Sequence, residues 1–355
     1  MKTIKHRNRK GKVNVAVVGL GVMGAAHIKA YQQIPEARII AVCAHTRVPV
    51  NGVLADISGT PSGRGGIRLD KNVKIYRQLE EVLADSDVDL VDLCLPTPLH
   101  VPQSIAALRA GKHVICEKPL ARNSKLAGEI VKAQRSAKGF FMPAMCMRFW
   151  PGWSLLKDLA DKGVYGKILA ARFRRVSGPP KWSRDRYFKG KESGGALLDL
   201  HIHDTDFVQY LFGRPTSVFS TGQSRFSGAI DHVVTQYRVA GGATVYAEGS
   251  WMMTEGFSMS YTVIFERATL DFDNARGKEV LRLDEEGKPS RVVKCKGTTG
   301  YVGELRHMIE SILSNKPPTI VTALDGVSAV EICEAEEKSV KMKKEIFLRK
   351  KSSRA

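Results

Sequence analysis

The sequence lacks several features that would assign it to common classes of protein. No apolar run is long enough to span a bilayer, so we expect no membrane partner. The six cysteines include no C-x-x-C pair, which argues against a zinc site or a disulfide frame and favours reduced thiols in a cytoplasmic protein. The G-x-S-x-G nucleophile elbow and the G-x-x-x-x-G-K-[ST] phosphate loop are also missing. Hydrolases and kinases of those types therefore lack support.

Acidic residues are scarce, because 36 Asp and Glu face 55 Lys and Arg, for a net charge of +19. Most of the excess lies at the two ends, since residues 1–12 and residues 341–355 each carry a net charge of +6. No helix-turn-helix or aromatic–basic sheet pattern accompanies these segments, so we interpret both as solvated basic tails and expect no nucleic-acid partner. The weakly basic remainder suits an anionic ligand such as a dinucleotide.

Strand-like and helix-like segments alternate through the first part of the chain. Such alternation predicts an α/β fold with a doubly wound, mostly parallel Rossmann sheet, which we place at residues 13–145. With 355 residues the chain has room for a second domain, which we place at residues 146–340. The expected strands of the first domain are 13–18, 37–43, 73–76, 90–95, 113–116 and 140–145.

A glycine motif follows the first expected strand directly. Gly19, Gly21 and Gly24 fit G-x-G-x-x-G before a helical stretch, where they permit a tight turn, close approach of a pyrophosphate, and close helix–strand packing. Val22 and Met23 would open the helix and offer free N–H groups to the phosphates. A glycine-rich turn without a ligand is the alternative.

The end of the second expected strand indicates which dinucleotide binds. A site that prefers NAD carries Asp or Glu there for the ribose 2′-hydroxyl, whereas this chain reads Ala44, His45, Thr46, Arg47. No carboxylate repels a 2′-phosphate, and a hydroxyl and an arginine stand ready to bind it. NADP(H) is therefore favoured, with NAD(H) as the alternative. The alternative is that Arg47 only starts the next helix or faces solvent, in which case it would not favour NADP(H) over NAD(H).

Two further strand ends carry ligand-binding candidates, because ligands of doubly wound sheets lie beyond the carboxyl ends of the strands. They are L-P-T-P-L-H (95–100) and C-E-K-P-L (116–120), and the segment 58–66 is a loop without an assigned role. The cofactor-binding candidates at these ends are Pro96, Thr97, His100, Glu117 and Lys118.

The order and spacing of G-L-G-V-M-G, L-P-T-P-L-H and E-K-P-L resemble those of the Gfo/Idh/MocA family, from about residue 13 to the end. The resemblance implies a C-terminal α/β domain with an open, mainly antiparallel sheet that commonly joins subunits, hence a homodimer or homotetramer. Strand-like runs that alternate polar and apolar residues between 216 and 266 fit that sheet.

The stretch D-L-H-I-H-D-T-D, residues 199–206, admits two interpretations. Two histidines two apart could bind a metal from a strand. The surrounding apolar residues, however, recur at helical spacing, and Gly213 with Pro215 gives a helix stop, so we expect a helix over 194–213 and no metal ligand set. On a helix, Asp199 and His203 are i and i+4 and share one face.

The resemblance assigns roles to these residues. It implies that Lys118 is catalytic beside the nicotinamide, that His203 is the general base, and that Asp199 orients or tunes the site. His203 also counts as a substrate contact, together with Arg148, Trp182 and Asp206. Position 201 commonly holds glycine in the family, so we expect His201 to pack against the sheet and Asp204 to be solvated or to pair on the helix surface.

These observations predict an NAD(P)-dependent oxidoreductase that transfers hydride between a secondary hydroxyl of a sugar or cyclitol and the nicotinamide. Two alternatives stay open from the sequence. A redox-neutral glycosidase of related fold would use the cofactor transiently, and a ligand-sensing Rossmann protein would bind without catalysis. A nucleic-acid binder that uses the basic ends is the least favoured.

Overall fold

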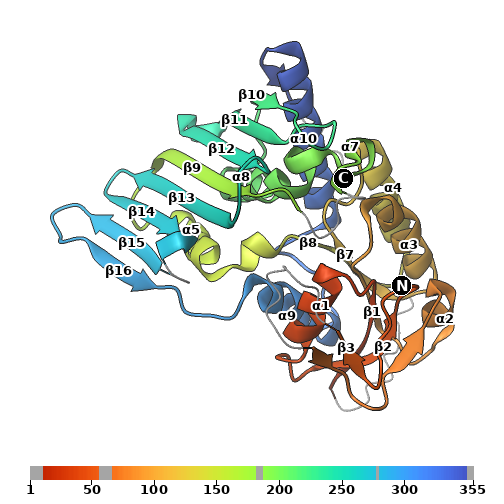
Figure 1. Ribbon diagram of the computed structural model, residues 1–355. Coiled ribbons are helices and arrows are strands. Elements are labelled where there is room, and N and C mark those ends of the chain that lie inside the picture. Colours follow the sequence, from red (N-terminus) through yellow and green to blue (C-terminus); the bar gives the residue numbers. More distant parts are fainter. Residues whose placement is uncertain (1–10, 56–65, 181–186, 277–279, 350–355) are drawn as a thin grey trace. The chain divides into compact units, whose positions relative to one another are not determined.

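The computed structural model describes residues 11–55, 66–180, 187–276 and 280–349, which form two compact units (Figure 1). The first unit comprises the described parts of Met1–Ala121, Lys125–Cys146 and Thr299–Val327. The second comprises the described parts of Arg122–Ser124, Met147–Thr298 and Ser328–Ala355. Trp182 and most of the expected N-terminal tail, of the loop 58–66 and of the distal C-terminal tail lie outside the described residues.

The first unit is built on a six-stranded parallel sheet in the order β5-β2-β1-β6-β7-β8, and it confirms the predicted Rossmann topology. All six expected strands form. Their bounds are β1 (Val13–Val18), β2 (Ala37–Cys43), β5 (Lys74–Tyr76), β6 (Leu90–Leu93), β7 (His113–Glu117) and β8 (Phe141–Ala144). A small hairpin adds β3 (Val53–Leu54) and β4 (Ile67–Arg68).

Side chains alternate between the two faces of this sheet. One face is covered by α2 (Leu79–Ala84), α3 (Thr97–Arg109) and α4 (Ser124–Ser136), whose apolar residues share a continuous core with the strands. The helices α1 (Val22–Tyr31) and α9 (Gly300–Leu313) pack together in the same unit. Residues of these two helices meet the opposite side chains of β6 and β7, where Asp92 and Glu117 lie.

The strand end at residues 95–100 leads directly into a helix, because α3 already begins at Thr97. Pro98 lies in its first turn, where a missing N–H costs nothing, and Pro102 lies inside the helix. The prolines therefore mark the start of a helix, and Thr97 belongs to its first turn.

The second unit contains a nine-stranded sheet in the order β16-β15-β14-β13-β9-β12-β11-β10-β17. Only the β9–β12 pair among these described strands is parallel, so the predicted mainly antiparallel sheet is confirmed. The bounds are β9 (Ile168–Ser177), β10 (Ser217–Gln223), β11 (His232–Arg238), β12 (Thr244–Ser250), β13 (Phe257–Phe265), β14 (Ala268–Asp273), β15 (Val280–Glu285), β16 (Arg291–Lys294) and β17 (Ile346–Phe347).

Helical segments pack on one face of this sheet around an aromatic core. The ring of Trp153 meets Tyr261 and Phe272 edge to face at centroid distances of 5.0 and 4.7 Å, and Phe173 meets Phe207 at 5.7 Å. The segments include the 3-10 turn η1 (Cys146–Phe149), α5 (Pro151–Asp161), α7 (Gly190–Ser193), the π-helical turn η3 (Leu197–His201), α8 (Ile202–Phe212) and α10 (Ala323–Met342). Short 3-10 turns also occur at η4 (Ala240–Gly242) and η5 (Asn274–Arg276).

The unit boundaries differ from the expected ones in two respects. Residues Thr299–Val327 return to the first unit, because α9 packs there beside α1. The segment from 341 is not simply a solvated tail, since α10 continues to Met342 and β17 pairs with β10. Ile346 and Phe347 supply the short strand between the basic residues.

No helix in the described part of the chain combines the length and the apolar character needed to cross a membrane. The six cysteines carry thiols in the structure, and all except Cys94 are buried.

The contact between η3 and β12 leads to a prediction about stability. A methyl group at Gly249 would lie 2.5 Å from Cβ of His201, whose side chain is fully buried. We expect Gly249→Ala to lower the free energy of unfolding by about 1–3 kcal/mol through overpacking, as measured by urea denaturation. Gly128→Ala is the control: nothing lies within 4 Å of that position in α4, and alanine there should stabilise by about 0.5–1 kcal/mol. Equal stability of Gly249→Ala and the parent would contradict the packing argument.

Candidate functional site

The glycine loop between β1 and α1 makes backbone contacts that exclude side chains at two positions. Gly19 has φ +91°, and a Cβ there would lie 2.3 Å from the carbonyl oxygen of Cys94. A Cβ at Gly24 would lie 1.9 Å from the carbonyl oxygen of Gly19. The Gly19 N–H donates to Cys43 O at 2.8 Å, which ties the loop to the end of β2. The loop is thus fixed against the ends of two neighbouring strands.

Gly21 differs from the other two glycines, because nothing lies within 4 Å of the place where its Cβ would stand. It is exposed and caps the N-terminus of α1, where the first helical N–H groups, including those of Val22 and Met23, have no intrahelical partner. Open space beside free N–H groups at the positive end of a helix is what a pyrophosphate requires. The expected positions of a dinucleotide cradle are therefore brought together.

Arg47 reaches back from the segment after β2 to the glycine loop. Its Nη1 donates to Leu20 O at 2.6 Å. A second arginine, Arg77, donates from Nη1 to His45 O at 2.9 Å. His45 and Thr46 are exposed, and no carboxylate occurs between Ala44 and Arg47. Two guanidinium groups therefore surround the end of β2, of which the sequence alone indicated only one.

His100 links the two other strand ends. Its Nδ1 lies 2.7 Å from Pro119 O and its Nε2 lies 2.7 Å from Leu95 O, and the residue is 1% exposed. Burial lowers the pKa of His100, while the two carbonyl oxygens oppose that shift by favouring a ring protonated on both nitrogens. Protein carbonyls thus occupy both ring nitrogens, so His100 holds the loops after β6 and β7 together instead of presenting a nitrogen to a cofactor. Pro96 and Thr97, beside it, are partly exposed.

Lys118 directly follows β7, and the peptide bond between it and Pro119 is cis. Its backbone N–H donates to Oε2 of Glu117 at 3.0 Å. Glu117 is 5% exposed, and its Oε1 lies 3.2 Å from Nε2 of His27. Burial alone would raise the pKa of Glu117, but His27 and then Lys118 outweigh it, so the pKa lies below its ordinary value. Glu117 is therefore a buried carboxylate that supports the neighbouring lysine.

The stretch 199–206 forms the predicted helical segment, with η3 widening its first turn before α8 begins. Asp199 and His203 are partly exposed, whereas His201, Asp204 and Asp206 are buried. The two candidate catalytic residues are thus both partly accessible to solvent. Lys118 belongs to the first unit and these two residues to the second, so each half of the expected site is described within its own unit.

Two buried arginine–aspartate pairs fix α8. Arg148 binds Asp206 through both carboxylate oxygens, at 2.9 and 2.7 Å, and its guanidinium lies 4.5 Å from the Tyr210 ring centroid. Arg175 from β9 binds Asp204 in the same manner, at 2.8 and 3.2 Å. The expectation that Asp204 is solvated or pairs on the surface is wrong, because the sheet covers that side of the helix. The guanidinium of Arg148 and the carboxylate of Asp206 bind each other. A substitution of either residue would therefore disturb α8 as well as any contact with a substrate.

His201 packs against the sheet, as predicted, and takes part in a buried polar network. Its Nε2 lies 3.1 Å from the hydroxyl of Tyr237, which donates to Oε1 of Glu336 at 2.7 Å. Thr205 also donates to Glu336 Oε1, at 3.1 Å. Sequence reasoning missed Tyr237, Glu336 and the partner Arg175, since nothing local in the sequence shows which buried groups meet.

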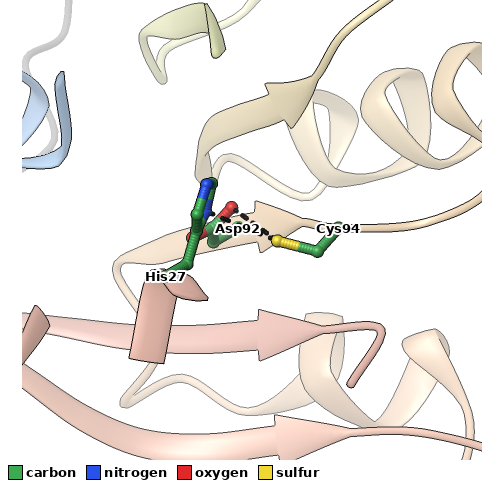
Figure 2. A group of neighbouring side chains, drawn as sticks. All are labelled: His27, Asp92 and Cys94. Carbon is green, nitrogen blue, oxygen red and sulfur yellow. Dashed lines mark hydrogen bonds and ion pairs between the residues drawn. The ribbon is translucent and has the colours of Figure 1, made fainter. Parts of the chain in front are cut away.

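Sequence reasoning also missed a cluster in the first unit. His27, Asp92 and Cys94 lie within bonding distance of one another (Figure 2), and their ligand atoms meet the spacing of a metal site. His27 Nδ1 and Asp92 Oδ2 are 2.8 Å apart, a hydrogen-bond length. Two ligands of one zinc ion at about 2.0 Å would stand about 3.3 Å apart. The sequence did contain one sign of this cluster, because Asp92 is an acidic residue inside the otherwise apolar strand L-V-D-L.

Comparison with known proteins agrees with this geometry. The profile described as "Oxidoreductase family, NAD-binding Rossmann fold" matches residues 13–145, and the GFO/IDH/MocA C-terminal domain matches residues 153–271. The chain is 27% identical to myo-inositol 2-dehydrogenase of Thermotoga maritima over 348 residues, 95% of this chain and 98% of that protein.

Two further relatives cover much of the chain. The 1,5-anhydro-D-fructose reductase of Ensifer adhaerens is 30% identical over 254 residues, 66% of this chain and 76% of that protein. The structure of levoglucosan dehydrogenase in complex with NADH and levoglucosan has the same fold, with a TM-score of 0.79, 20% identity, and coverage of 96% of this chain and all of that one.

The glycine loop leads to a prediction that separates folding from binding. Gly24→Ala should destabilise the protein and abolish dinucleotide binding, because its methyl group meets the Gly19 carbonyl. Gly21→Ala should leave the free energy of unfolding unchanged within about 0.5 kcal/mol. Its methyl group would fill the open space at the helix end and weaken dinucleotide binding by about tenfold or more, roughly 1.4 kcal/mol.

Thermal unfolding and calorimetric titration with NADP⁺ and NAD⁺ measure the two effects. A Gly21→Ala protein that binds either dinucleotide as tightly as the parent would exclude this loop as the pyrophosphate site.

Proposed function

Since this chain belongs to the Gfo/Idh/MocA family of oxidoreductases, we propose that it is an NADP(H)-preferring dehydrogenase of a secondary hydroxyl in a sugar or cyclitol. The observation that carries the proposal is the fixed glycine loop, in which two positions exclude a side chain and the third leaves open space at a helix N-terminus. The named activities of the relatives, on myo-inositol, 1,5-anhydro-D-fructose and levoglucosan, support the substrate class.

The residues that would hold the dinucleotide fit its chemistry. Gly21, Val22 and Met23 would receive the pyrophosphate with backbone N–H groups. Thr46 and Arg47, with Arg77 beside them, would receive the ribose 2′-phosphate. When bound, the nicotinamide supplies a hydride acceptor, or a hydride donor in the reverse direction.

We assign the proton chemistry to three side chains. In the oxidative direction His203 takes the hydroxyl proton while the hydride leaves the same carbon, so the alcohol becomes a carbonyl and two electrons leave with the hydride. A histidine suits this role because its ordinary pKa is close to neutral pH. Asp199, which is also partly exposed, orients or tunes His203. Lys118 stabilises negative charge that develops on the reacting oxygen.

Dehydrogenase activity should depend on His203. Purified protein is mixed with NADP⁺ or NAD⁺ and a panel of sugars, sugar acids and inositols, and absorbance of reduced nicotinamide is followed. We expect net reduction with at least one panel member and a loss of about 10²- to 10⁴-fold in kcat for His203→Ala. His232→Ala, a partly exposed histidine of β11 in the same unit, is the control and should keep full activity. Net reduction that survives His203→Ala would refute the assigned base, and none with any panel member would refute the dehydrogenase proposal.

The residues at the end of β2 should determine the preference between NADP⁺ and NAD⁺. We expect the parent to bind NADP⁺ more tightly than NAD⁺. Arg77→Ala should weaken NADP⁺ binding by about tenfold while leaving NAD⁺ binding within about twofold. The variant loses a guanidinium that would bind the 2′-phosphate, and NAD⁺ has no such phosphate. Arg109→Ala, an exposed arginine at the end of α3, is the matched control. Calorimetry gives the four dissociation constants, and a parent that binds NAD⁺ equally well or better would contradict the preference.

A further inference from the structure

A cluster of ionisable side chains lies buried between the first unit's sheet and the helices α1 and α9, beneath the strand end that carries Lys118. His27 comes from α1, Asp92 from β6, Glu117 from β7, and Glu304 from α9. His27, Asp92 and Glu304 are fully buried, and Glu117 is 5% exposed. Such groups are costly to remove from water unless they are paired, so their arrangement needs a reason.

His27 and Asp92 form the central pair (Figure 2). Nδ1 of His27 lies 2.8 Å from Oδ2 of Asp92, and the Cys94 thiol lies 3.4 Å from the same nitrogen. Burial alone would lower the pKa of His27, but Asp92 and then Cys94 raise it well above its ordinary value. The pair therefore stabilises the fold fully below the unfolded-state pKa of about 6.5, and this contribution is lost only as the pH rises through the higher folded-state pKa.

The other ring nitrogen of His27 faces Glu117. Nε2 lies 3.2 Å from Oε1 of Glu117, an ion-pair contact without hydrogen-bond geometry, while Oε2 of the same carboxylate accepts the backbone N–H of Lys118 at 3.0 Å. A continuous series of polar contacts thus runs from Asp92 through the imidazole and the carboxylate to Lys118.

Burial raises the pKa values of three other titratable neighbours of His27, which favours their neutral forms. Glu304 Oε1 lies 3.7 Å from Nε2, and burial raises the pKa of Glu304 well above its ordinary range, which favours the protonated acid. Tyr301 of α9, with its ring centroid 6.1 Å from that of His27, and Tyr31 of α1 both have pKa values raised by burial. The His27 ring thus lies between the carboxyl groups of Asp92 and Glu117, and Lys118 follows Glu117 directly in the chain.

We propose that His27 is a positioning residue, held by Asp92, that fixes the carboxylate of Glu117 and through it the backbone of Lys118. The functional part of this inference rests on the proposed catalytic role of Lys118. Asp92 itself lies inside β6, where its carboxylate contacts His27 Nδ1 and the Cys94 thiol, and we expect its effect on the reaction to pass through His27. Loss of the pair would leave the glycine loop in place while freeing the carboxylate that supports the lysine.

The experiment uses Asp92→Asn, which removes the charge and keeps the shape. Asp89→Asn is its matched control, because Asp89 lies in the same unit just before β6 and accepts the Asn14 N–H at 2.9 Å. His27→Gln is the second variant should Asp92→Asn fold poorly. The first readout is hydrogen exchange of the Lys118 amide by NMR, together with the protonation state of the His27 ring.

We expect a doubly protonated His27 ring at pH 7 in the parent. In Asp92→Asn the Lys118 amide should exchange about tenfold faster and kcat should fall by about 10- to 100-fold, since small displacements of a catalytic group are costly. The dissociation constant of NADP⁺ should stay within about threefold. Asp89→Asn should change neither the exchange of Lys118 nor kcat.

Each result has a defined meaning. Unchanged exchange at Lys118 in both Asp92→Asn and His27→Gln, or a neutral His27 ring at pH 7, would overturn the positioning role. An equal loss of kcat in Asp89→Asn would overturn it too, because the effect would then be general destabilisation. Faster exchange at Lys118 in a protein whose parent has no dehydrogenase activity would support the positioning role and refute the proposed function.

Discussion

The first unit depends on the close approach of three stretches of backbone at the glycine loop. The carbonyls of Cys94 and Gly19 occupy the positions that side chains at 19 and 24 would need. This contact fixes where α1 begins and in which direction it runs across the sheet. Because α1 is a rigid helix, the same contact places His27 one turn further on, over Asp92 in β6. The open helix end and the buried ion pair are thus two consequences of one backbone constraint.

Buried charges fix orientation in the second unit as well. Asp204 and Asp206 are held by arginines from β9 and η1, and each pair uses both carboxylate oxygens, which restricts rotation as well as distance. Removing one member of such a pair leaves an uncompensated charge at a cost of about 3–5 kcal/mol. With these two aspartates held inward, Asp199 and His203 remain partly exposed.

The sequence predicted those features that are encoded locally and missed those that depend on distant partners. Six apolar runs gave the strands of the first sheet, and the glycine spacing gave the cradle, because periodicity and backbone sterics act over a few residues. The pairing of Asp204 with Arg175, and of His27 with Asp92, joins residues that are far apart in the chain. The return of Thr299–Val327 to the first unit was missed for the same reason.

The π-helical turn η3 departs from α-helical geometry, and Gly249 in the neighbouring strand β12 makes room for it. A π-turn inserts one extra residue and widens the helix, and here the widened turn brings the His201 side chain against β12. Glycine at 249 leaves room for it, and Tyr237 and Glu336 give its Nε2 polar neighbours. A large polar residue at 201 therefore requires both a missing side chain on β12 and a buried acceptor on α10. Asp199 lies in this turn and His203 follows it. The partial exposure of both residues therefore depends on the contacts that His201 makes with β12.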